Sequence, residues 1–105
     1  MSDVDYAVEK LWQAVHKLVS GPGRIKERLE EAAANVAMAA GARSAMSSDL
    51  RAEYDSTWSL LIAIAPKGNE GAVRATISQM SEEEAGGIAS RILNVANMAT
   101  KAGEK

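Results

Sequence analysis

The stretch at residues 3–19, DVDYAVEKLWQAVHKLV, carries the clearest helical pattern in the chain. Large apolar side chains recur at intervals of three and four, which places them on one face of a helix: Val4, Val8, Leu11, Trp12, Val15, Leu18 and Val19. Ser2 or Asp3 is a suitable N-cap, and Gly21 is suited to a left-handed C-terminal position. The stretch therefore predicts an amphipathic helix whose apolar face other segments must cover.

Four further segments have helical spacing, and turn-forming residues separate them. They span residues 22–40, 48–65, 70–80 and 81–101, with breaks around 20–23, 41–48 and 66–71. Residues 58–65 are apolar nearly all round, so we expect the third helix to be central, with Pro66 ending it. No segment alternates with period two. We therefore predict an all-α, compact antiparallel bundle of four to five helices, a single domain over residues 1–105 with frayed last residues.

The start of the fifth helix has its own signature. Ser81 and Glu84 form a capping box, and Glu82 and Glu83 between them suit the positive end of the helix dipole. Gly86 and Gly87 follow at once and lower the helix propensity there. They indicate either a close contact with another helix or a loosened first turn.

Composition limits the core and several kinds of chemistry. The 105 residues include 20 Ala and no Cys or Phe, and Leu, Ile and Val together also number 20. We expect a thin core in which alanines on the second and fifth helices allow close packing. Without Cys, disulfides, zinc–thiolate clusters and thiolate nucleophiles are excluded. The acidic start of the chain and the absence of a long apolar run predict a cytoplasmic protein with no membrane segment.

The residues that catalysis needs do not form a recognisable set. His16 is the only imidazole, and the sequence identifies no partner for it. No Glu-x-x-His motif occurs, and the glutamates of the second helix fall on its outward face. The glycines around Pro22 are better explained by a helix–helix turn than by an anion site. We therefore expect no enzyme activity, no metal and no cofactor.

Nucleic-acid binding is the alternative function. Arg24, Lys26 and Arg28 cluster at the start of the second helix and could contact a phosphate backbone. The fourth and fifth helices have the proportions of a helix-turn-helix, but three glutamates occupy the turn that would enter the groove. The net charge of −2 also argues against this alternative.

Protein binding is the function that the sequence favours. Met38 falls on the outward face of the second helix and Met46 in the loop after it, and methionine adapts well to partner surfaces. We predict a docking face on the outer side of the second helix and the following loop, for a protein partner or a second copy: Glu27, Glu30, Glu31, Met38, Arg43 and Met46.

No motif matches a named family. In size and composition alone, the chain resembles short accessory proteins of phages and mobile elements, which are small, helical and free of Cys and of catalytic sets. That resemblance implies a protein that acts as an inhibitor or accessory factor by covering or bridging a surface of another protein.

Overall fold

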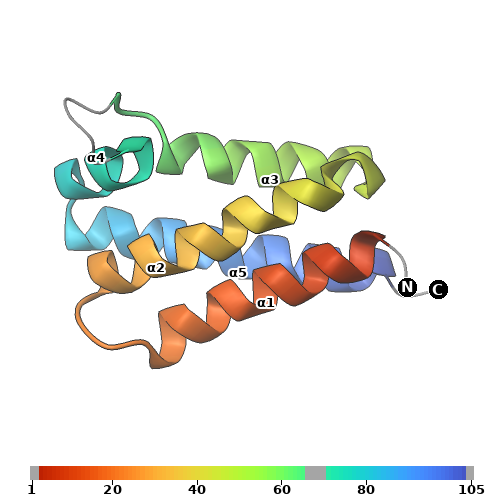
Figure 1. Ribbon diagram of the computed structural model, residues 1–105, viewed down its shortest axis with the longest axis horizontal. Coiled ribbons are helices and arrows are strands. Elements are labelled where there is room, and N and C mark those ends of the chain that lie inside the picture. Colours follow the sequence, from red (N-terminus) through yellow and green to blue (C-terminus); the bar gives the residue numbers. More distant parts are fainter. Residues whose placement is uncertain (1–2, 66–70, 104–105) are drawn as a thin grey trace.

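Helices make up almost all of the computed structural model, which describes residues 3–65 and 71–103. The elements are α1 (Asp3–Ser20), α2 (Ile25–Met38), the 3₁₀ helix η1 (Ala39–Ala45), α3 (Ser48–Leu61), α4 (Gly71–Gln79) and α5 (Glu82–Gly103). The long helices α1, α2, α3 and α5 lie along the long axis, and helices joined by a short turn run in opposite directions (Figure 1). No strand occurs in the described ranges, so the predicted all-α antiparallel bundle is confirmed.

The buried face of α1 is narrower than the sequence predicts. Ala7, Leu11, Ala14 and Leu18 are buried, whereas Val19 is 76% exposed. Trp12 lies at the edge, where its Nε1 donates a hydrogen bond to Thr100 Oγ1 of α5 at 2.7 Å. The face is centred on two alanines because α2 and α5 both pack closely against α1.

Gly23, not Gly21, adopts the left-handed conformation in the turn between α1 and α2, with φ of +87°. Gly21 is required for a different reason, because a Cβ there would lie 2.5 Å from the Lys17 carbonyl oxygen. Arg28 Nη1 donates to the Leu18 carbonyl oxygen at 2.7 Å and ties the start of α2 to the end of α1.

The segment after α2 is helical, although the sequence predicts a loop there. It forms η1, and Arg51 of α3 donates hydrogen bonds to the carbonyl oxygens of Arg43, Ser44 and Met46. These bonds satisfy carbonyl groups that the end of a helix leaves free. A base from the next helix therefore stabilises a segment whose own sequence reads as a loop.

The third helix is not the central one. α3 ends at Leu61, four residues earlier than predicted, and Leu60, Ile62 and Ile64 are each more than a third exposed. The predicted stop at Pro66 lies outside the described residues. α2 contacts every other helix because its buried face includes small side chains, Ala32 and Ala33, that let neighbours approach.

Serine side chains cap the N-termini of α3 and α5, and at α5 the predicted capping box is present. Ser47 Oγ accepts a hydrogen bond from the Leu50 amide at 3.3 Å, and Ser81 and Glu84 bond reciprocally at 3.0 Å. Gly86 and Gly87 make no close contact, since a Cβ at either would meet no atom within 4 Å. Their presence is therefore not explained by helix packing.

Candidate functional site

A groove runs along the outer side of α2, where α3 and α4 flank it. We call it the α2 groove. Its volume is about 230 Å³, and it is lined by Glu30, Ala33, Ala34, Ala37, Trp58, Val73 and Arg74. The floor is made of alanine methyl groups because α2 presents Ala34 and Ala37 to solvent. Trp58 of α3 is half-buried against the core and supplies the one large aromatic wall.

An ion pair closes the acidic end of the α2 groove. Arg74 Nε of α4 lies 2.9 Å from Glu30 Oε1, and both side chains are partly exposed. Glu27, Glu30, Glu31 and Arg74 together line an adjoining hollow of about 460 Å³. Three carboxylates therefore face one guanidinium at this end.

A second ion pair lies beyond the other end of α2. Arg43 of η1 donates two hydrogen bonds to the carboxylate of Asp55 on α3, a bidentate arrangement that fixes both side chains. This contact lowers the pKa of the Asp55 carboxyl and raises the pKa of Arg43. Arg51 also lowers the Asp55 pKa through its charge. The positive charges of Arg43 and Arg51 therefore both stabilise the carboxylate of Asp55 at this end.

Five of the six predicted docking residues are accessible. Glu27, Glu30, Glu31 and Arg43 border the two charged ends, and Met38 on the outer face of α2 is 48% exposed. Met46 is the exception. Its side chain is only 3% exposed and belongs to the core, because the 3₁₀ turn rotates it inward.

The sequence missed Trp58, Asp55 and Arg74, which complete this face. Each comes from a different helix than α2, and Arg74 meets Glu30 across 44 positions of chain. Nothing in the local pattern of α3 or α4 marks these residues, since their role depends on which helix lies beside them.

The basic cluster proposed for nucleic acid is partly engaged within the fold. The Arg28 side chain is half-buried and donates a hydrogen bond to the Leu18 carbonyl oxygen. The backbone amide of Arg24 donates to Glu27 Oε1 at 3.3 Å, which brings that carboxylate beside the cluster. Lys26 is half-buried on the opposite side of α2 from Arg28. The three bases therefore do not present one uniform surface.

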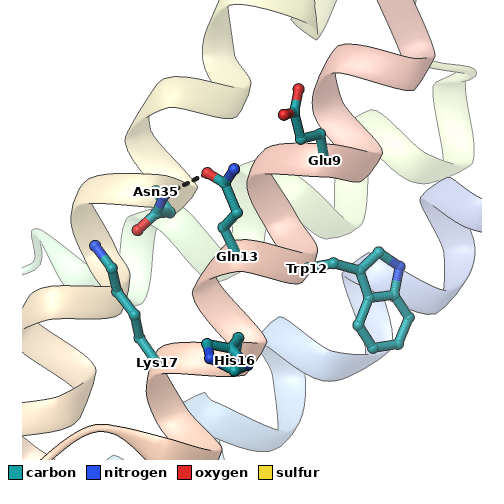
Figure 2. Close-up of a pocket in the computed structure, with 6 residues that line it drawn as sticks. All are labelled: Glu9, Trp12, Gln13, His16, Lys17 and Asn35. Carbon is teal, nitrogen blue, oxygen red and sulfur yellow. Dashed lines mark hydrogen bonds between the residues drawn. The ribbon is translucent and has the colours of Figure 1, made fainter.

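Another hollow, of about 570 Å³, lies over α1 and reaches α2 (Figure 2). It is lined by Glu9, Trp12, Gln13, His16, Lys17 and Asn35. Asn35 is 5% exposed and its Nδ2 donates to Gln13 Oε1 at 3.0 Å, the bond drawn in Figure 2. The titratable side chains that line this hollow, Glu9, His16 and Lys17, are not hydrogen-bonded to one another. The hollow therefore presents separate polar groups rather than an assembled acid–base pair.

The α4–α5 pair, which has the proportions of a helix-turn-helix, is strongly acidic at the start of its second helix. Glu82, Glu83 and Glu84 are all exposed on the first turn of α5. The backbone amide of Ser81 hydrogen-bonds Glu84 and lowers the pKa of that carboxyl. This turn carries negative charge where a DNA-reading helix would meet phosphate.

Residues 3–65 and 71–103 contain no group of three metal-ligating side chains and no helix long and apolar enough to cross a membrane. In comparisons with known proteins, no protein family, curated protein or solved structure matches the chain.

Proposed function

We propose that the chain is a non-catalytic protein-interaction module that covers or bridges a partner surface with the outer face of α2. The observation that carries the proposal is the exposure of Met38 beside the apolar floor of the α2 groove. An apolar centre with polar ends is the usual anatomy of a protein interface. The face extends from Glu27 to Arg43 and includes Trp58 and Arg74.

The physical basis is burial of an adaptable apolar surface. Met38 can change rotamer to fit a partner at small cost, and Trp58 offers a large area with little entropy to lose. The charged side chains at the two ends remain hydrated and contribute mainly to orientation and association rate. The module would thus act by steric occupation and needs no reacting group.

Met38→Glu tests the proposal. The carboxylate would have to lose its hydration at the centre of the interface, so partner capture from the host lysate and any self-association should both be lost. Leu93→Glu is the matched control, because Leu93 is 43% exposed on α5 and lies outside the face. If Met38→Glu binds as the wild type does, the proposed face is wrong.

Contact with a nucleic-acid backbone through Arg24, Lys26 and Arg28 is the alternative proposal. It predicts binding to DNA or RNA that weakens steeply as salt rises. The acidic neighbours Glu27 and Glu31 on the same helix oppose it. A titration at low salt that shows no binding would remove this alternative.

A further inference from the structure

The hollow over α1 has the size and the walls of a small-molecule site. Its volume, about 570 Å³, lies within the range of about 300–1,000 Å³ that ligand pockets occupy. Trp12 forms an aromatic wall on one side and Asn35 of α2 lies on the other, with Gln13 and His16 between them (Figure 2). The Trp12 side chain is 37% exposed, so a ligand can pack against its ring.

Asn35 brings an unpartnered polar atom to this wall. The residue is only 5% exposed. Its Nδ2 donates to Gln13 Oε1 at 3.0 Å, whereas its Oδ1 is buried and has no hydrogen-bond partner. Most buried polar atoms in folded proteins are hydrogen-bonded, so an unpartnered amide oxygen on the wall of a hollow points to a donor that a ligand supplies.

Access to Asn35 Oδ1 depends on the side chain of Lys17. Lys17 is half-buried and extends from α1 toward Asn35 on the same side of the hollow (Figure 2). Its ammonium group does not hydrogen-bond to Oδ1. Long side chains change rotamer within nanoseconds, and a turn of Lys17 outward returns the ammonium group to water and opens the way to Oδ1.

The charges of the lining favour an uncharged ligand. Among the described residues that line the hollow, Glu9 carries a carboxylate and Lys17 an ammonium group. A charged ligand would therefore be attracted by one of them and repelled by the other. The remaining features, an aromatic face and a hydrogen-bond acceptor, select a flat ring that carries an N–H or O–H donor.

We propose that the hollow over α1 binds a small, uncharged aromatic molecule that donates a hydrogen bond to Asn35 Oδ1 and packs its ring against Trp12. The site is separate from the outer face of α2, because Asn35 lies on the side of α2 that meets α1. The proposal is therefore independent of the proposed function.

Indole and benzofuran test the hydrogen bond to Asn35. The two probes have the same shape, but benzofuran has a ring oxygen where indole has an N–H group. We expect indole to bind about tenfold more tightly, because it alone pairs the buried acceptor. NMR titration of the isotope-labelled chain measures the Kd of each probe, and the side-chain signals of Trp12 and Asn35 should shift on binding.

Asn35→Leu removes the acceptor and keeps a side chain of similar shape. This variant should bind the two probes about equally. Asn94→Leu is the matched control, because Asn94 is exposed on α5, and it should keep the preference for indole. Circular dichroism shows whether each variant is folded. If Asn35→Leu does not fold, Trp12→Leu replaces it, and it should weaken the binding of both probes while the preference for indole remains.

Three results would overturn the proposal. In the first, millimolar indole shifts no signal of the residues that line the hollow. In the second, the wild type binds the two probes equally or binds benzofuran more tightly, in which case the amide would present its NH₂ group instead of its oxygen. In the third, the preference for indole survives in Asn35→Leu, in which case another group accepts the hydrogen bond.

Capture of a protein partner through the α2 face is a separate measurement. None of these results changes what Met38→Glu is expected to show.

Discussion

At the residue scale, one buried hydroxyl group connects two helices of the bundle. Tyr54 of α3 is 2% exposed, and its hydroxyl donates to the Val36 carbonyl oxygen of α2 at 2.6 Å. α2 and α3 share few other contacts, because the α2 groove separates part of their length. One hydroxyl thus fixes the spacing of the groove walls near Trp58.

Tyr54→Phe should lower the free energy of unfolding at neutral pH by about 1 kcal/mol, the usual net value of one hydrogen bond. Burial raises the pKa of Tyr54 from 10.0 to about 12 in the folded state. A group with a raised folded pKa stabilises below its unfolded pKa, and that contribution is lost as pH rises through the folded pKa. The free energy of unfolding of the wild type should therefore fall between pH 10.0 and about pH 12.

Urea unfolding from neutral pH to about pH 12 measures the Tyr54 effect. The fall attributable to Tyr54 should be absent in the Tyr54→Phe variant. Tyr6→Phe, at an exposed position on α1, should keep the wild-type profile. Parallel curves for the wild type and Tyr54→Phe would show that this hydroxyl does not contribute.

At the element scale, helix ends and loop segments depend on contacts that differ from helix to helix. α5 starts with its own capping box, whereas η1 is held by Arg51 from the following helix. The two glycines in the first turns of α5 occupy open space, so no neighbour requires them. We therefore expect them to affect stability mainly through the conformational entropy that they add to the unfolded chain.

Gly87→Ala should raise the free energy of unfolding by about 0.5–1 kcal/mol, since alanine loses less entropy and meets no atom. Gly23→Ala should lower it. Gly23 has a φ of +87°, and the new Cβ would lie 2.7 Å from Glu27 Oε2. Thermal unfolding of both variants checks the contrast. A destabilised Gly87→Ala protein would mean that this turn of α5 has a packing role.

At the scale of the whole molecule, close helix packing takes the place of a large apolar core. Among the core residues with no exposed surface are Ala7, Ala14, Ala32, Ala39, Ala85, Ala96 and Ala99. The radius of gyration, 13.3 Å, matches the value of about 13 Å for a compact chain of 100 residues. Small side chains thus allow a dense bundle even though large apolar residues are few.

Ala32→Leu should destabilise the bundle by about 1–3 kcal/mol, because added methylene groups in a tightly packed interior force the helices apart. Ala52→Leu, at an exposed position of α3, should change stability by less than about 0.5 kcal/mol. Urea unfolding of the two variants measures the difference. A more stable Ala32→Leu protein would indicate an unfilled cavity between α1, α2 and α5.

The approximate positions of the five α-helices, the N-cap at Ser81 and the outward position of Met38 could be predicted from local sequence. Each depends on spacing within one helix or on bonds over three residues. The central helix, the burial of Met46 and the left-handed residue in the first turn could not be predicted. These depend on which face of a segment meets another helix, and spacing along the chain leaves that open.

The candidate docking face likewise combines features that local sequence predicts with features that only helix packing creates. The sequence by itself determined that α2 is an amphipathic helix with acidic residues, alanines and one methionine outward. Only the tertiary structure decided that Trp58 and Arg74 flank it and that Asp55 pairs with Arg43. The physical reason is the separation along the chain over which each interaction acts. Backbone hydrogen bonds and helical periodicity act over a few residues, whereas a groove and its charges arise where helices distant in sequence pack together.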